Sequence, residues 1–229
     1  ASSKEIRPVP DRVAAALGAN LYFTRFTGHG RQPAAMAEAT VGRWMDDVGE
    51  AIKIGNQIGE TVIIMATSTG ATLAAAAALD EAAMENIGGI IFISPNFAIN
   101  SRAASLLTWP FARQWVPLVI GAEQQGIARN DLHARYWTMN YPTTALMPMA
   151  AIVAAVDQES FDDVDIPALF YYSRQDQVVA PDKTAEFARS WGGASTTLIA
   201  SLTADDDKFS HIIAGDIVSP NQTASAADH

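Results

Sequence analysis

The sequence predicts an α/β fold, a three-layer α/β/α architecture with a mainly parallel sheet. Short runs rich in β-branched residues alternate with alanine-rich stretches of helical periodicity, and strands separated by helices usually pair in parallel. The 229 residues are enough for one sizeable domain. With 49% hydrophobic and 17% charged residues, the chain has the composition of a globular protein that buries a core.

Five runs are predicted as strands, and the stretches between them as helices. The strands are 21–26 (LYFTRF), 61–66 (TVIIMA), 90–94 (IIFIS), 167–173 (PALFYYS) and 195–202 (STTLIASL). The run at 61–66 is apolar on both faces, as in a central strand that helices cover. The helices are 11–17, 40–58, 70–85 and 181–191, and Gly88-Gly89 is predicted to end the third of these.

The alternation of strand and helix stops between residues 97 and 163. This segment is broken by four prolines and is rich in aromatic and methionine residues. Additional helices that simply close the core would have this composition. An insertion at the carboxyl end of a strand, however, lies where α/β proteins bind ligands. We therefore expect a helical cap (a lid domain) at 97–163, inserted after the strand at 90–94, on a core made of residues 1–96 and 164–229.

Composition also narrows the range of partners. A formal charge of −10 repels nucleic acid and anionic membranes, and no apolar run is long enough to cross a bilayer. The chain has no cysteine, which excludes disulfides, thiolate metal sites and cysteine nucleophiles. No metal or organic cofactor is implied. The lack of cysteine fits the cytoplasm, which we expect, although many exported bacterial proteins also lack it.

The strongest local motif is Ala66-Thr67-Ser68-Thr69-Gly70, between an apolar run and an alanine-rich helix. A serine on so tight a strand-to-helix turn needs small residues two positions before and after it. The turn lifts the hydroxyl above the sheet, at a helix N-terminus that favours a developing anion. Alternatively, Ser68 or Thr69 merely caps the helix.

A serine nucleophile needs a histidine base and an acid that orients it. His211 follows the last predicted strand, and Asp176 comes a few residues beyond the strand at 167–173, so the chain order is serine, acid, histidine. His29 and His133 are expected to be structural, hydrogen-bonded residues. The competing acids are Asp165, Asp182 and Asp205 to Asp207; the last three are expected to form a solvated loop, with calcium binding a remote option.

The chain resembles the capped carboxylesterases and monoacylglycerol-lipase-like members of the α/β-hydrolase superfamily. The resemblance rests on FTGHGRQP (26–33), ATSTG (66–70), ISPNF (93–97), SRQDQVVAPD (173–182) and SHIIAGD (210–216). It implies that Ser68 is the nucleophile, Asp176 the orienting acid and His211 the general base, with the backbone N–H of Thr69 as one oxyanion donor. The position of Ala66 is usually glycine in this family.

A second departure from the family concerns the sheet. Family members have another parallel strand before the run at 21–26, placed in the sheet between the runs at 21–26 and 61–66, and the loop after it supplies a second oxyanion donor. This chain begins within or just after that loop, so it lacks the N-terminal strands and would leave two unpaired inner edges. We therefore expect a fragment of a longer chain, or another element in the gap. The family's closing helix is expected to be short or absent.

These observations predict a serine esterase or lipase-like hydrolase. The aromatic and methionine-rich cap favours a small-molecule ester substrate with an apolar portion. The same triad also serves amide or carbon–carbon bond hydrolysis, and a catalytically silent ligand-binding protein of the same fold is the alternative from a different class.

Overall fold

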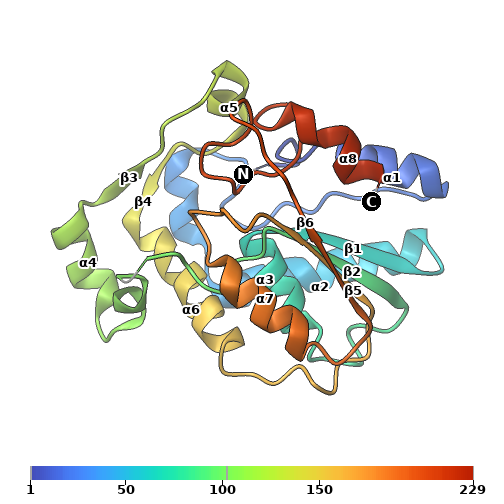
Figure 1. Cartoon of the computed structure of the whole chain (residues 1–229). Helices are drawn as coiled ribbons and strands as arrows, with labels where there is room; N and C mark the ends of the chain where they lie inside the picture. The colour runs from blue at the N-terminus through green and yellow to red at the C-terminus, as the bar shows by residue number, and fades with distance from the viewer. Residues whose placement is uncertain (1, 102, 229) are drawn as a thin grey trace.

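The computed structural model describes residues 2–101 and 103–228. Its main sheet is parallel, with strand order β1-β2-β5-β6. These strands are β1 (Val62–Thr67), β2 (Ile87–Ile93), β5 (Ala168–Tyr172) and β6 (Ser195–Ile199). A separate antiparallel pair joins β3 (Glu123–Gln125) to β4 (Asn140–Pro142). Figure 1 shows the main sheet in the body of the molecule and the small pair to its side.

Eight α-helices and four 3₁₀ turns surround the strands in the part of the chain that the structure describes. The α-helices are α1 (Val9–Leu17), α2 (Val41–Ile58), α3 (Thr69–Ala77), α4 (Ala112–Ile120), α5 (Asp131–Tyr136), α6 (Leu146–Val156), α7 (Pro181–Ser190) and α8 (Thr223–Asp228). The 3₁₀ turns are η1 (Pro33–Glu38), η2 (Ala104–Thr108), η3 (Thr143–Ala145) and η4 (Pro220–Gln222).

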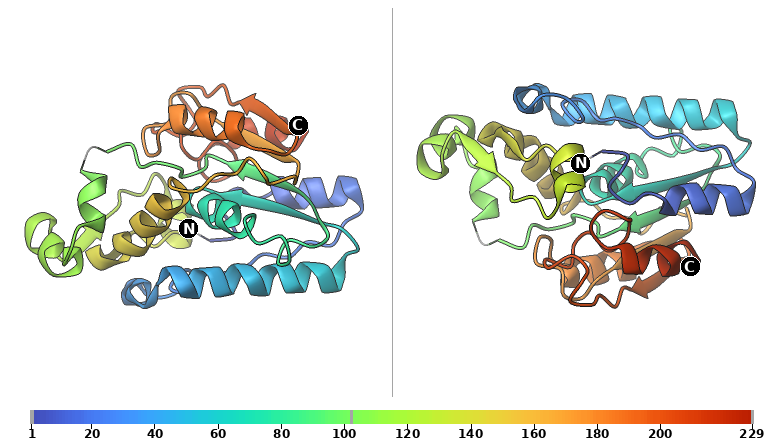
Figure 2. Two further views of the ribbon diagram at one scale, coloured as in Figure 1. Left: turned by 90° about the horizontal axis from the view of Figure 1, so that it is seen from below. Right: turned by 90° about the horizontal axis from the view of Figure 1, so that it is seen from above.

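Helices lie on both faces of the sheet, which confirms the three-layer α/β/α prediction (Figure 2). Successive side chains of a strand point to opposite faces. Phe92 and Phe170, fully buried and stacked at 4.9 Å, belong to the core cluster that includes residues of α2, α3, α6 and α7. Ile93 and Tyr171, each next in sequence, belong to a second cluster against which Ala226 of α8 packs.

The predicted strand at 21–26 is wrong. This segment is an extended loop with exposed side chains, Leu21 and Tyr22 among them. In the described part of the chain the main sheet ends at β1, so no neighbouring strand offers backbone hydrogen bonds to residues 21–26. The run at 61–66 accordingly forms an edge strand rather than a central one, and Ile63 is 52% exposed. Among the described residues β1 is therefore one outer edge of the sheet, and the expected gap with two unpaired inner edges is not seen.

Two boundaries also differ from the sequence prediction. The alanine-rich helix α3 ends at Ala77 rather than 85. Gly88 and Gly89, predicted to end that helix, instead lie inside β2. A Cβ on Gly88 would come 2.5 Å from the Thr61 side chain, so close approach of the chains, rather than helix termination, accounts for that glycine. The closing helix α8 is only six residues long, as expected.

Between β2 and β5 the chain forms α4, α5, α6 and the short β3–β4 pair; we call residues 97–163 the inserted segment. In Figure 1 its helix α4 projects to one side of the molecule, whereas α6 lies against the body. Among the described residues, no helix has the combination of length and apolar character needed to span a bilayer.

Candidate active site

Ser68 lies on the tight turn between β1 and α3. Its backbone has φ 53° and ψ −122°, a region that residues other than glycine rarely adopt. Besides the first hydrogen bonds of α3, two backbone hydrogen bonds to the end of β2 and the residues after it hold this conformation: the Ser68 N–H donates to the Ile93 carbonyl (3.0 Å), and the Ser68 carbonyl accepts from Asn96 N–H (3.1 Å). The Ser68 side chain does not cap α3, so the alternative interpretation of Ser68 as a helix cap is wrong.

The structure brings Ser68, His211 and Asp176 into one hydrogen-bonded row. The Ser68 Oγ lies 3.0 Å from Nε2 of His211, and Nδ1 of His211 lies 2.8 Å from Oδ2 of Asp176. A carboxylate only accepts hydrogen bonds, so Nδ1 carries the proton and Nε2 is free to accept one from the serine hydroxyl. Ser68 follows β1 in the sequence, Asp176 follows β5 and His211 follows β6.

Asp176 is held by the backbone of its own loop. Its Oδ1 accepts hydrogen bonds from the N–H groups of Val178 (2.8 Å) and Val179 (3.0 Å), which leaves Oδ2 for His211. The carboxylate is buried, with Asp176 4% exposed. Of the acids weighed in the sequence, Asp176 is the one that hydrogen-bonds the His211 ring within the described residues, whereas Asp182 lies in the first turn of α7.

The aspartate run at 205–207 is not the solvated loop that the sequence predicted. Asp205 is exposed, but Asp206 is 2% and Asp207 5% exposed. Their carboxylates accept hydrogen bonds inside the chain, Asp206 from Thr203 and Gln222 and Asp207 from backbone N–H groups near His211. Within residues 2–101 and 103–228, no three His, Asp or Glu side chains are grouped so that they could hold a metal ion.

Gly215 follows the His211 loop where it meets the N-terminal segment. Its φ is +99°, and a Cβ there would lie 2.5 Å from the Glu5 carbonyl oxygen. The next residue, Asp216, donates its N–H to the Arg7 carbonyl at 3.0 Å. Only glycine allows both the positive φ and the close approach of the Glu5 carbonyl without displacing the backbone.

The other two internal histidines lie outside this row and have structural contacts. His29 packs against Phe26 and Trp44, and burial lowers its pKa from 6.5 to about 4. His133 accepts a hydrogen bond from the Arg129 backbone N–H through Nδ1 (3.1 Å), and burial, more than the nearby Arg129 charge, lowers its pKa.

The contacts of Asn96 and Asp207 were not foreseen from the sequence. Asn96 follows β2 and holds the turn: its carbonyl accepts from Thr72 Oγ1 (2.6 Å), and its Nδ2 lies 3.4 Å from Thr69 Oγ1. The sequence feature that could have pointed to Asn96 is its position directly after a proline that ends a strand. For Asp207 that feature is its position four residues before His211.

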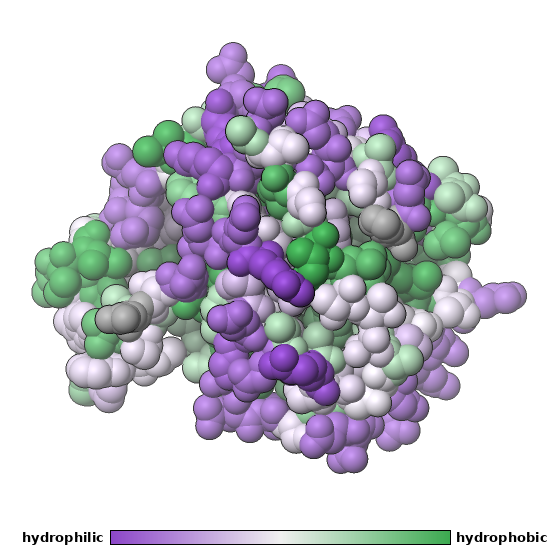
Figure 3. Space-filling model, viewed as in Figure 1, coloured by the Kyte–Doolittle hydropathy of each residue, from purple (hydrophilic) through white to green (hydrophobic). Residues whose placement is uncertain are grey.

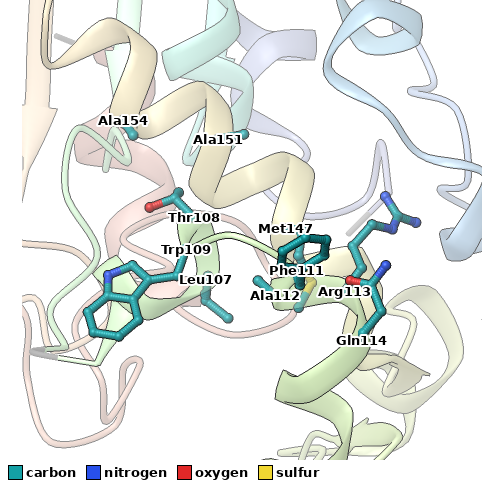
Figure 4. Close-up of a pocket in the computed structure, with 10 residues that line it drawn as sticks. All are labelled: Leu107, Thr108, Trp109, Phe111, Ala112, Arg113, Gln114, Met147, Ala151 and Ala154. Carbon is teal, nitrogen blue, oxygen red and sulfur yellow. The ribbon is translucent and has the colours of Figure 1, made fainter.

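The inserted segment presents apolar side chains to solvent. Figure 3 shows green surface at the side of the molecule where Figure 1 places α4, and Phe111, Leu118 and Val119 are each more than two-thirds exposed. A hollow of about 540 Å³ lies among η2, α4 and α6 (Figure 4). Its lining is largely apolar: Leu107, Trp109, Phe111, Ala112, Met147, Ala151 and Ala154, with Thr108, Arg113 and Gln114.

Comparison with known proteins agrees with this architecture. Residues 11–203 match the family model described as serine aminopeptidase, S33. The chain belongs to this family. It is therefore a hydrolase of the α/β-hydrolase fold, as the sequence resemblance implied. The family match covers Ser68 and Asp176 and stops before His211. None of the curated proteins compared with the chain matches it.

Solved structures of the same fold include several lipolytic enzymes. One, from work on the metagenome-derived lipolytic enzymes LipS and LipT, is 21% identical to this α/β hydrolase, with a TM-score of 0.66 over 97% of this chain and 87% of that one. A soluble variant of monoglyceride lipase from Saccharomyces cerevisiae is 11% identical, with a TM-score of 0.68 over 99% and 81%. The monoacylglycerol lipase of Paleococcus ferrophilus is 15% identical, with a TM-score of 0.58 over 85% and 80%. At such identities the likeness concerns the fold.

Proposed function

We propose that this protein is a serine esterase, which cleaves carboxylic esters with an apolar portion through Ser68, His211 and Asp176. The observation that carries the proposal is the row of contacts from Ser68 Oγ to His211 Nε2 (3.0 Å) and from His211 Nδ1 to Asp176 Oδ2 (2.8 Å). A nucleophile, a base and an orienting acid within hydrogen-bond reach form the arrangement that acyl transfer requires.

In the proposed reaction, His211 Nε2 takes the proton of the Ser68 hydroxyl as Oγ attacks the ester carbonyl carbon. Asp176 keeps the imidazole in the required tautomer and stabilises its cation. His211 then gives the proton to the leaving alcohol, and an acyl-enzyme remains on Ser68. Water, deprotonated by His211, attacks that acyl group. The bond between Ser68 Oγ and the acyl carbon then breaks as His211 returns the proton to Oγ, which releases the carboxylic acid.

Thr69 is the proposed donor to the oxyanion of the tetrahedral intermediate. It is the first residue of α3, so its backbone N–H has no acceptor within the helix. The N-terminal end of a helix also favours negative charge.

The inserted segment supports an apolar substrate, and we propose that it acts as a cap. Its exposed aromatic and aliphatic side chains and the hollow among η2, α4 and α6 offer contact to a hydrocarbon portion. The lipase and monoacylglycerol lipase neighbours support an ester in particular. The family's description as serine aminopeptidase favours a second candidate, cleavage of an N-terminal amino acid amide by the same three residues.

A fluorophosphonate probe tests the proposed nucleophile. The wild-type protein is expected to be labelled on Ser68, and Ser68→Ala and His211→Ala to lose labelling. Ser105→Ala, which removes an exposed serine of η2, serves as the control and keeps it. Strong labelling that persists in both Ser68→Ala and His211→Ala would contradict the assignment.

Hydrolysis assays separate the two candidate activities and test the hollow. We expect p-nitrophenyl esters of increasing acyl length to be cleaved, and amino acid p-nitroanilides to be cleaved poorly; the reverse preference would favour the aminopeptidase. Ala151→Trp, which fills the hollow, is expected to raise KM for long acyl chains more than for acetate. Ala155→Trp places the same bulk on an exposed position of α6 outside the lining and is the matched control.

A further inference from the structure

The buried carboxylate of Asp207 holds the backbone at His211 in place. Oδ2 of Asp207 accepts hydrogen bonds from the N–H groups of His211 and Ile212, both at 2.9 Å. The Asp207 backbone N–H in turn donates to Ser219 Oγ at 3.0 Å. Hydrogen bonds to an ionised carboxylate are stronger than neutral ones, so the position of Asp207 sets the position of the His211 main chain.

The countercharge of Asp207 comes from the inserted segment. Nη2 of Arg129 lies 2.6 Å from Asp207 Oδ1, and the side chains of this ion pair are 20% and 4% exposed. The other guanidinium nitrogen, Nη1, donates to the Asp206 carbonyl at 3.0 Å. Arg129 therefore holds both the carboxylate and the main chain that precede the histidine.

The residue after Arg129 makes a second link between the same two parts of the chain. Asn130 caps α5 by accepting the His133 N–H through Oδ1, and its Nδ2 donates to the Ile217 carbonyl at 2.8 Å. The Nδ1 atom of His133 accepts the Arg129 N–H, which is a second hydrogen bond at the start of α5. The inserted segment is thus joined to the His211 loop on both sides of the histidine in sequence, at Asp206–Asp207 and at Ile217.

Loss of the arginine would leave a buried carboxylate without its countercharge, which is a costly arrangement. The carboxylate would then move toward solvent, and this displacement weakens its hold on the two N–H groups. A displacement of about 1 Å at a catalytic group can lower a rate by about 10²-fold.

We propose that Arg129 is a positioning residue for His211: through the Asp207 carboxylate it aligns the imidazole with Ser68, so the placement of the inserted segment governs the reactivity of the triad. The inference rests on the proposed function of His211 as the base. In this proposal Arg129 acts through Asp207 and not by contact with the substrate.

Arg129→Met, Arg129→Lys and the control Arg135→Met test this role. Arg135 is an exposed arginine of α5 that lies over the Tyr136 ring. With a short ester such as p-nitrophenyl acetate, Arg129→Met is expected to lower kcat about 10- to 100-fold, with KM within about twofold of the wild-type value. Arg129→Lys restores the positive charge but has one nitrogen in place of the two that contact Asp207 and Asp206, so it should recover part of kcat. Arg135→Met should leave both kcat and KM unchanged. Circular dichroism and Tm establish that each variant is folded.

A spectroscopic measurement keeps the test independent of turnover and of any folding defect in Arg129→Met. The Nδ1 proton of His211, hydrogen-bonded to Asp176, is expected to give a downfield ¹H NMR signal that is shifted or broadened in Arg129→Lys and unchanged in Arg135→Met. An unchanged signal, a kcat of folded Arg129→Met within twofold of the control, or a loss confined to KM would each overturn the inference. If the wild-type protein shows the signal but cleaves no ester, the proposed function fails and the positioning of His211 is still tested.

Discussion

His29 is expected to make the stability of this fold sensitive to acid. Its ring lies between Phe26 and Trp44, with centroid distances of 6.1 and 5.8 Å. Its Nδ1 lies 3.4 Å from the Thr27 carbonyl oxygen. Burial disfavours the charged imidazolium, and it lowers the pKa from 6.5 to about 4. The substitution His29→Gln keeps a polar side chain at this position but removes the group that titrates.

The sign follows from comparing proton binding in the folded and unfolded states. The folded pKa lies below the unfolded one, so the unfolded chain binds the proton first as the pH falls, and the fold loses stability between about pH 6.5 and 4. A difference of about 2.5 pKa units corresponds to about 3.4 kcal/mol once the pH is well below 4. At pH 5 the same two pKa values give about 2 kcal/mol, against almost nothing at pH 7.5.

Urea unfolding at pH 7.5 and pH 5.0 measures this effect in the wild-type protein and in His29→Gln. The fall in unfolding free energy between the two pH values is expected to be smaller in the variant by about 2 kcal/mol. The comparison at pH 7.5 controls for any packing change caused by glutamine. Equal pH dependence in the two proteins, or an NMR titration of His29 in the folded protein with a pKa near 6.5, would show that buried His29 does not cause the acid sensitivity.

Three further predictions concern the triad, one glycine and the core. Asp176→Asn removes the carboxylate that orients the base, and ester hydrolysis is expected to fall by about 10⁴-fold in kcat while Tm changes little; activity near the wild-type level would exclude Asp176 as the orienting acid. Gly215→Ala places a Cβ 2.5 Å from the Glu5 carbonyl oxygen at a φ of +99°, so thermal unfolding should show a lower Tm. Its control is Gly49→Ala inside α2, where the added Cβ meets open space; this change should raise the free energy of unfolding by about 0.5–1 kcal/mol. Phe92→Ala empties a fully buried position of the core and is expected to cost about 3–5 kcal/mol in urea unfolding; a loss below about 1 kcal/mol would indicate that the core has refilled.

The fold class and the meeting of three distant side chains were predictable because their determinants are local in sequence. Ser68 has small neighbours and a strand–helix boundary around it, and Asp176 and His211 each come soon after a β-rich run. Parallel strands bring their carboxyl ends to one edge of the sheet, so the chain order of the runs is enough to predict that the three residues converge. The α2 prediction succeeded for a similar reason, since an amphipathic period needs no knowledge of the partner surface.

The failures concern properties that depend on distant partners. The run at 21–26 has a strand's composition, but a strand also needs a neighbouring backbone, and in the described residues the sheet ends at β1. Gly88 and Gly89 are indistinguishable in sequence from a helix stop, yet both lie inside β2, and Gly88 allows Thr61 and β2 to approach each other closely. Strand pairing and close approach are fixed by tertiary structure, which local patterns do not encode.

The aspartate run shows why burial of charge is the hardest of these properties to foresee. Three successive carboxylates ordinarily favour solvent, because burying one without a partner is costly. Here Asp207 is buried because the guanidinium that pairs with it comes from Arg129, on a segment far away in the sequence, and because its second oxygen accepts the N–H groups of His211 and Ile212. A hydrophilic sequence around a candidate catalytic histidine therefore does not by itself indicate a solvated loop. A loop that positions an imidazole against a serine needs hydrogen bonds to its backbone, and here one buried carboxylate accepts two of them.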